Sequence, residues 1–118
     1  MADRNPHIRN FVQRELGAAG YRVYTAETAD QLGNWLRRPG RMDALVIDPD
    51  IPGLANADHL NRLLCARPEL AVIFHCLAAD CRALPYAGRN TVYVEKCAQS
   101  VDLLKEKLHA VFSLPSPM

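Results

Sequence analysis

The sequence has no long apolar run and no strong excess of charge of either sign. Its apolar stretches fall far short of the about 20 residues that a membrane-spanning helix requires. The 14 lysines and arginines nearly balance the 13 aspartates and glutamates, and the net charge of +1 gives no electrostatic reason to bind nucleic acid or anionic membranes. The amino terminus, MADRNPHIRN, is polar and shows no signal peptide, so we expect a cytoplasmic protein.

The spacing of the cysteines is unusual for a metal site. The four cysteines, Cys65, Cys76, Cys81 and Cys97, form no CxxC pair. In a chain without an export signal we expect them to be reduced thiols rather than a disulfide framework. A zinc or redox cluster of His75 with Cys76, Cys81 and Cys97 is an alternative, although a Cys-x4-Cys spacing is not a usual structural zinc pattern.

Motifs for nucleotide binding and serine hydrolysis are also absent. The chain contains no GxGxxG sequence, no P-loop and no GxSxG sequence, so neither function has support from a motif. Its 118 residues, 49% of them hydrophobic, are typical of one globular domain with a sizeable core.

Apolar segments alternate with amphipathic segments along most of the chain. Strands are predicted at four places: 21–25 (YRVYT), 44–47 (ALVI), 71–74 (AVIF) and 92–95 (VYVE). Helices are predicted at 6–16, between Thr28 and Pro39, at 57–66, and from Ser100 onward, whereas residues 77–91 are weakly patterned. Strands that alternate with helices predict an α/β fold with a parallel sheet.

The stretch DALVIDPDIPGL carries the first candidate for a functional group. Asp48 directly follows a strand that is expected to be buried. In parallel α/β sheets, ligands bind beyond the carboxyl ends of the strands, which makes Asp48 a candidate site residue. The alternative is that Asp48 and Asp50 only form the turn ahead of Pro52 and Gly53.

The order of these motifs resembles that of a response-regulator receiver domain over about residues 3–112. DALVIDPDIPGL is similar to the family's strand that ends in the phosphoacceptor aspartate, here Asp48, with a proline four residues later. VYVEKC resembles the fifth strand, in which Lys96 holds the position of the family's lysine and Tyr93 that of its switch aromatic. The resemblance implies a flavodoxin-like, doubly wound parallel sheet, with residues 1–112 as a receiver-like domain and 113–118 as a flexible tail.

The resemblance also implies a chemistry for these residues. In the family, an aspartate carboxylate attacks a phosphoryl group supplied by a histidine kinase, while a divalent cation and a lysine screen the anions. Here Asp48 would be the nucleophile and Lys96 the screening cation. The implied Mg²⁺ ligands are Asp3, Asp48 and the backbone carbonyl of Asp50.

Several features depart from the family pattern, among them the following. The second acid of the family's first loop falls on Arg4, whose guanidinium would stabilise the Asp48 carboxylate and compete with the metal ion. The position of the switch hydroxyl falls on Cys76, or on His75 if the register differs by one, and neither is serine or threonine. Almost nothing precedes Asp3, so we expect the central first strand to be truncated or missing, which favours pairing in a homodimer.

Three functions therefore compete. The leading hypothesis is an atypical two-component receiver that acts through protein contacts around Tyr93 and the helix after Ser100, with weak or lost phosphorylation. The first alternative is a working phosphoacceptor, phosphorylated on Asp48 by a histidine kinase with Mg²⁺. The second is a thiol-based redox or metal sensor that uses Cys76 and Cys97. We expect a histidine kinase or another signalling protein as partner, no contact with nucleic acid or membrane, and no enzyme activity beyond phosphorylation and dephosphorylation of Asp48.

Overall fold

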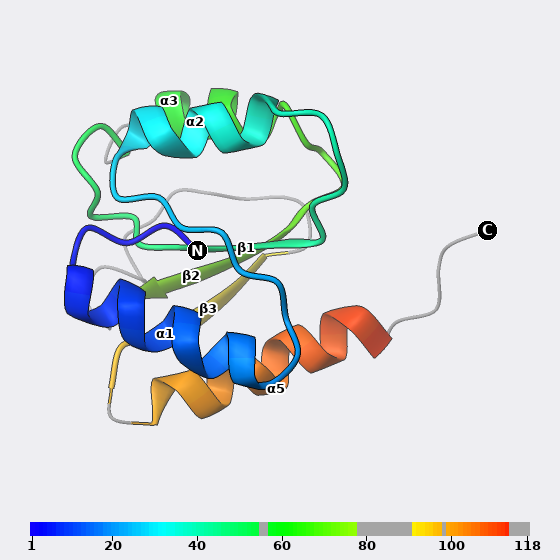
Figure 1. Ribbon diagram of the computed structural model, residues 1–118. Coiled ribbons are helices and arrows are strands. Elements are labelled where there is room, and N and C mark those ends of the chain that lie inside the picture. Colours follow the sequence, from blue (N-terminus) through cyan, green and yellow to red (C-terminus); the bar gives the residue numbers. More distant parts are fainter. Residues whose placement is uncertain (55–56, 78–90, 98, 114–118) are drawn as a thin grey trace.

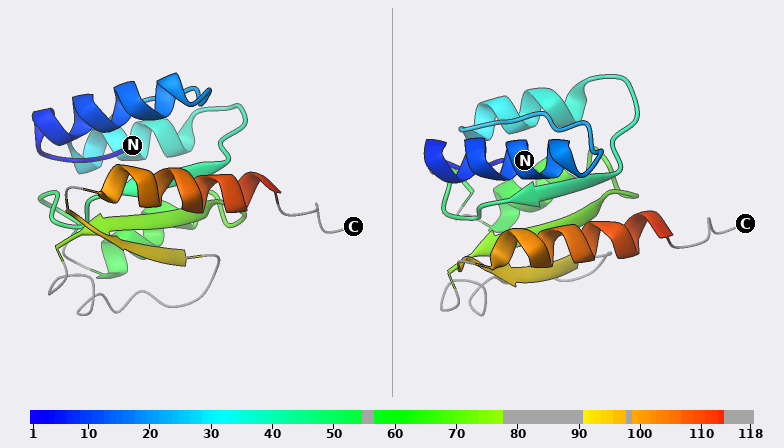
Figure 2. Two further views of the ribbon diagram at one scale, coloured as in Figure 1. Left: turned by 90° about the horizontal axis from the view of Figure 1, so that it is seen from below. Right: turned by 60° about the horizontal axis from the view of Figure 1, so that its bottom comes forward.

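The computed structural model describes residues 1–54, 57–77, 91–97 and 99–113. Within these ranges, helices cover both faces of a three-stranded sheet of β1 (Ala44–Ile47), β2 (Ala71–Cys76) and β3 (Thr91–Glu95). The helices are α1 (Pro6–Ala18), α2 (Ala29–Arg37), α3 (Ala57–Leu64) and α5 (Ser100–Ser113). Helices α2 and α3 lie on one face of the sheet, and α1 and α5 lie on the other (Figures 1 and 2). The predicted α/β architecture is confirmed.

Strand β2 is the middle of this sheet and pairs in parallel with both neighbours. Ala44 of β1 is opposite Ala71, and Thr91 of β3 is opposite Val72. Every residue of β2 is buried, because helices cover both sheet faces. Parallel pairing aligns the carboxyl ends of the three strands at one edge of the sheet.

The amino terminus forms a short stub of a further strand beside β1 (Figure 1). Ala2 makes isolated parallel bridges to Ala26 and to Ile47. Its N–H donates to the Val46 carbonyl at 2.8 Å, and its carbonyl accepts from the Asp48 N–H at 2.8 Å. Across the molecule the order is therefore the segment at Ala26, the stub, β1, β2 and β3.

The predicted strand at 21–25 is wrong. These residues carry no sheet pairing, and only the next residue, Ala26, forms a bridge. Alternating β-branched and aromatic residues suit a strand, but a strand also needs a hydrogen-bonded neighbour. The neighbour of this segment is the stub, whose bridge reaches only Ala26.

Other boundaries differ by one or two residues. Strand β2 continues to Cys76, β3 begins at Thr91, and α3 ends at Leu64. Thr28, at the predicted start of this helix, caps α2, with its hydroxyl accepting from the Gln31 N–H at 3.1 Å. The weakly patterned stretch at 77–91 falls mostly on residues 78–90, and the tail at 113–118 falls mostly on 114–118; both lie outside the described residues.

Two apolar clusters hold the helices against the sheet. The cluster on the α2 and α3 face includes Leu32, Leu60 and Phe74, and the cluster on the α1 and α5 face includes Leu16 and Leu104. All five side chains are buried. Full burial of one such side chain contributes about 1.5–3 kcal/mol, so this packing fixes the strand ends that carry the polar residues.

The expectation of four reduced cysteines is wrong for Cys76, which is disulfide-bonded. Its partner lies outside the described residues, as does Cys81. Cys65 and Cys97 are free and exposed. In the part of the chain that the structure describes, no helix has the length and apolar character to cross a membrane.

Candidate functional site

Two aspartates and a lysine from distant parts of the chain meet at the carboxyl edge of the sheet. Asp3 follows the stub, Asp48 follows β1, and Lys96 follows β3. The Lys96 Nζ lies 3.2 Å from Asp3 Oδ2 and 3.4 Å from Asp48 Oδ2. Both aspartates are fully buried, and the Lys96 side chain is only 14% exposed. We call these three residues the acidic pocket.

Backbone groups hold each aspartate by one carboxylate oxygen. The Asn5 N–H donates to Asp3 Oδ1 at 2.8 Å, and the Asp50 N–H donates to Asp48 Oδ1 at 3.0 Å. The second oxygen of each, Oδ2, is buried without a hydrogen-bond partner among the described residues and faces Lys96. The loops thus aim two carboxylate oxygens at one ammonium group.

The acidic pocket holds more negative than positive charge. Burial raises the pKa of Asp3 above its ordinary value of 3.8, although its hydrogen bond from Asn5 and the Lys96 charge act in the opposite direction. The neighbouring Asp48 charge raises the pKa of Asp3 further. An additional cation would therefore stabilise this group of residues in its ionised form.

Arg4 supplies a second cation at the mouth of the acidic pocket. Its Nε lies 3.7 Å from Asp48 Oδ2, and its Nη2 lies 3.6 Å from Asp50 Oδ2. The Arg4 side chain is 54% exposed, so it covers the buried Asp48 from the solvent side. Arg4, which departs from the family pattern, therefore contacts Asp48, the aspartate that follows β1.

The donor set suits a divalent cation, but two protein cations already contact it. Asp3 Oδ2 and Asp48 Oδ2 are the hard oxygen ligands that Mg²⁺ prefers. Among the described residues, no group of three or more His, Cys, Asp or Glu side chains could hold a metal ion. A bound Mg²⁺ would depend on these two carboxylates and backbone oxygens, and Arg4 and Lys96 would compete for the same atoms.

Alternation along β2 separates the two candidates for the switch position. His75 faces α5, with its Nε2 3.0 Å from Ser100 Oγ, and the charges of Lys96 and Asp48 act on its ring. Cys76 packs into the apolar cluster on the opposite face. His75 and Cys76 therefore lie on opposite faces of the sheet, His75 on the α1 and α5 face and Cys76 on the α2 and α3 face. The thiol-sensor hypothesis gains no support, because Cys76 is fully buried and disulfide-bonded.

His75 makes stability dependent on pH. Burial lowers the pKa of His75 from 6.5 to about 4. Between pH 6.5 and pH 4 the unfolded chain binds a proton at His75, whereas the folded chain does not. The contribution of neutral His75 to the free energy of unfolding is therefore fully present above pH 6.5 and is lost as the pH falls. From about pH 7 to about pH 5 we expect a loss of about 2 kcal/mol in the free energy of unfolding. Urea denaturation of the wild type and of His75→Gln measures this, and a pH slope that is the same in both proteins contradicts it.

Sequence reasoning missed the contact between His75 and Ser100. The last helix, α5, begins at Ser100 as predicted, but the Ser100 hydroxyl contacts His75 of β2. Tyr93, the expected switch aromatic, stacks on Phe74 across the two strands at a ring distance of 5.3 Å and is 40% exposed. Both contacts join residues far apart in sequence, so local pattern gave no signal for either.

Comparison with known proteins identifies the fold. No family model and no curated protein sequence matches the chain. Among solved structures, the chain is similar to the response regulator TrrA from Thermotoga maritima in complex with Mg²⁺ and BeF, with 24% identity, a TM-score of 0.75, and coverage of 93% of this chain and 94% of that one. The chain has the receiver-domain fold.

Two further receiver structures support this assignment. The non-phosphorylated HemR receiver domain from Leptospira biflexa is 20% identical with a TM-score of 0.75, covering 99% of this chain and 94% of that one. A Burkholderia pseudomallei response regulator with a phosphorylated aspartic acid, a calcium ion and citrate is 17% identical with a TM-score of 0.70. The match covers 99% of this chain and 73% of that one. The fold predicted from motif order is thus confirmed.

Proposed function

We propose that this chain is an atypical receiver module of two-component signalling, which acts through protein contacts and in which aspartyl phosphorylation is weak or lost. The observation that carries the proposal is the charge arrangement at the sheet edge. Lys96 already contacts both buried aspartates, and Arg4 covers Asp48 and Asp50 from the solvent side. A receiver-like nucleophile is present, but protein cations surround it.

Asp48 is the proposed phosphoacceptor position and Lys96 the proposed screening cation. Attack by a carboxylate on a phosphoryl group brings anions together, and a divalent ion normally offsets that repulsion. Here Arg4 lies 3.7 Å from Asp48 Oδ2, so its guanidinium opposes both a metal ion at that oxygen and access from solvent. Phosphorylation would therefore be slow even with Mg²⁺ held by Asp3, Asp48 and the carbonyl of Asp50.

The proposed output surface lies around β3 and α5. Three large apolar side chains there are exposed to a third or more of their area: Tyr93 (40%), Leu103 (39%) and Phe112 (46%). Exposed aromatic and aliphatic groups of this kind supply the apolar core of protein interfaces. A histidine kinase or another signalling protein is the proposed partner, and a second copy of the chain is a further candidate.

Intact-mass measurement after incubation with acetyl phosphate and Mg²⁺ tests this proposal. We expect only a small fraction of the protein to gain about 80 Da, the mass of one phosphoryl group. Asp48→Asn is the matched control, since it keeps the shape of the side chain and removes the nucleophile. Modification of most molecules, abolished in Asp48→Asn, would contradict weak phosphorylation.

That contrary result would support the second candidate function, a working phosphoacceptor. One observation favours this candidate: Asp3 Oδ2 and Asp48 Oδ2 are both buried and face the same point, since they lie 3.2 Å and 3.4 Å from Lys96 Nζ. A metal ion could use both atoms if Arg4 swung outward, and the Arg4 side chain is half exposed. The Mg²⁺ dependence of the modified fraction separates this route from metal-free phosphorylation.

A further inference from the structure

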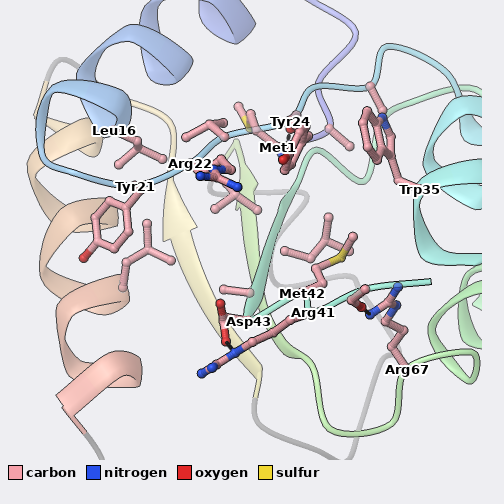
Figure 3. Close-up of a pocket in the computed structure, with 18 of the residues that line it drawn as sticks. Met1, Leu16, Tyr21, Arg22, Tyr24, Trp35, Arg41, Met42, Asp43 and Arg67 are labelled. Carbon is pink, nitrogen blue, oxygen red and sulfur yellow. Dashed lines mark hydrogen bonds and ion pairs between the residues drawn. The ribbon is translucent and has the colours of Figure 1, made fainter. Parts of the chain in front are cut away.

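A cavity of about 1030 Å³ lies between residues 21–25 and β1 (Figure 3). It follows β1 from Arg41, ahead of the strand, to Val46, and Met1 and Ala2 line its far end. The residues of the acidic pocket do not line it. The cavity is therefore a separate site, with a volume at the upper end of the range for small-molecule sites in proteins.

Side chains, rather than sheet pairing, hold residues 21–25 at their distance from β1. Trp35 of α2 donates from its Nε1 to the Thr25 carbonyl at 3.0 Å. Tyr21 stacks on Phe112 of α5, with ring centroids 5.3 Å apart. Contacts with two helices thus fix this wall of the cavity.

The cavity has an apolar lining along β1. Leu32 lines it from α2 and Leu108 from α5, and both side chains are buried. The other aliphatic and methionine side chains along this part are those of Leu16, Val23, Met42, Leu45 and Val46. Such a lining favours an apolar group of a ligand, because transfer of apolar surface out of water is favourable.

Positive charge gathers where the cavity meets the amino end of β1. The charged side chains that line the cavity are those of Arg22, Arg38, Arg41, Arg67 and Asp43. Ala26 and Ile47 both bridge to Ala2, so Arg22 lies about level with Asp43, just ahead of β1. Figure 3 shows Arg22 and Asp43 beside the cavity.

The acidic side chain at this end leaves most of the positive charge unbalanced. Asp43 pairs with Arg41 at 2.7 Å. Among the described residues, neither Arg22 nor Arg38 forms an ion pair. The Arg38 guanidinium instead lies 4.6 Å from the centre of the Trp35 ring. This end of the cavity therefore complements an anionic group.

We propose that the cavity binds the anion of a medium-chain fatty acid, with its carboxylate at the arginines and its acyl chain along β1 toward Ala2. Arginine forms strong, charge-assisted hydrogen bonds with carboxylates. Residues 41–46 span about 16 Å as extended chain, so the ligand that fits is elongated, with one charged end and an apolar tail. The proposal does not involve Asp48 and is independent of the proposed function.

Titration with decanoate, followed by the fluorescence of Trp35, tests the proposal. Trp35 is the single tryptophan of the chain, and it lines the cavity. We expect a saturable change, with affinity that rises about tenfold for each two methylenes from hexanoate through octanoate to decanoate. Decyltrimethylammonium has the same tail with the opposite charge, and we expect it to bind at least about tenfold more weakly.

The Arg22→Gln variant tests the position of the carboxylate. Because Arg22 is exposed, the variant should fold, and we expect its affinity for decanoate to fall by about tenfold. Arg14→Gln removes the same charge from an exposed residue of α1 that does not line the cavity, and it should bind as the wild type does. Decanoate should also shift the amide NMR signals of Met42 and Val46.

Three results would overturn the proposal. The first is the absence of a saturable response of Trp35 and of the Met42 and Val46 amides to millimolar decanoate. The second is equal affinity for decanoate and decyltrimethylammonium, or an equal loss in Arg22→Gln and Arg14→Gln. The third is binding to vesicles that contain anionic phospholipid without any response to monomeric decanoate, which would assign the arginines to a membrane surface.

Discussion

Replacement of Lys96 by methionine is expected to lower the free energy of unfolding by about 3–5 kcal/mol. Lys96 is the cation within 3.2 Å of Asp3 and 3.4 Å of Asp48, and both aspartates are fully buried. Methionine keeps most of the side-chain volume but leaves two buried carboxylates without that charge. Chemical denaturation at neutral pH measures the loss.

Lys105→Met is the matched control for this change. Lys105 pairs with Glu15 at 3.3 Å, but both side chains are about a third exposed, so the loss should stay below about 1 kcal/mol. The pKa of Asp3 is raised in the folded state, so its contribution to stability is present at acid pH and is lost as the pH rises through that pKa. The defect of Lys96→Met should therefore shrink in acid. Equal losses for the two lysine variants would contradict the role assigned to Lys96.

The Arg4→Asp variant is expected to bind Mg²⁺ at least about tenfold more tightly than the wild type, a gain of about 1.4 kcal/mol. The substitution removes a cation 3.7 Å from Asp48 Oδ2 and adds a third carboxylate beside Asp3 and Asp48. Without metal the variant should be less stable, since the repulsion between acids grows. With millimolar Mg²⁺ its melting temperature should rise, because the ion binds the folded state.

Arg14→Asp makes the same charge change on an exposed residue of α1 and serves as control. Calorimetric titration with Mg²⁺ and thermal melts with and without the ion apply to all three proteins. A similar Mg²⁺ response in Arg4→Asp and Arg14→Asp would show that net charge, rather than the position of Arg4, governs metal binding.

Much of the fold and the meeting of Asp48 with Lys96 follow from sequence pattern. The strand segments ALVI and VYVE are each followed directly by a charged residue, Asp48 and Lys96. Parallel strands align their carboxyl ends, so residues 48 positions apart arrive at one edge. The order of motifs then gave the receiver-type topology that the solved structures share.

Other features depended on contacts that no local pattern encodes. Residues 21–25 have strand composition, yet their pairing depends on a stub that reaches only Ala26. The sequence left open which of His75 and Cys76 faces the α1 and α5 layer, because a shift of one residue exchanges the two sheet faces and only the packing of β2 shows the face of each side chain. The cavity beside Met1 likewise arises from the relative placement of segments rather than from composition.

The pKa of Asp3, followed through the NMR shift of its carboxyl carbon, tests the buried acidic pocket most directly. The account predicts a value above 3.8, because burial and the Asp48 charge outweigh Lys96 and the Asn5 hydrogen bond. A value at or below 3.8 would contradict it, since Asp3 would then lie in a solvated or fully neutralised site.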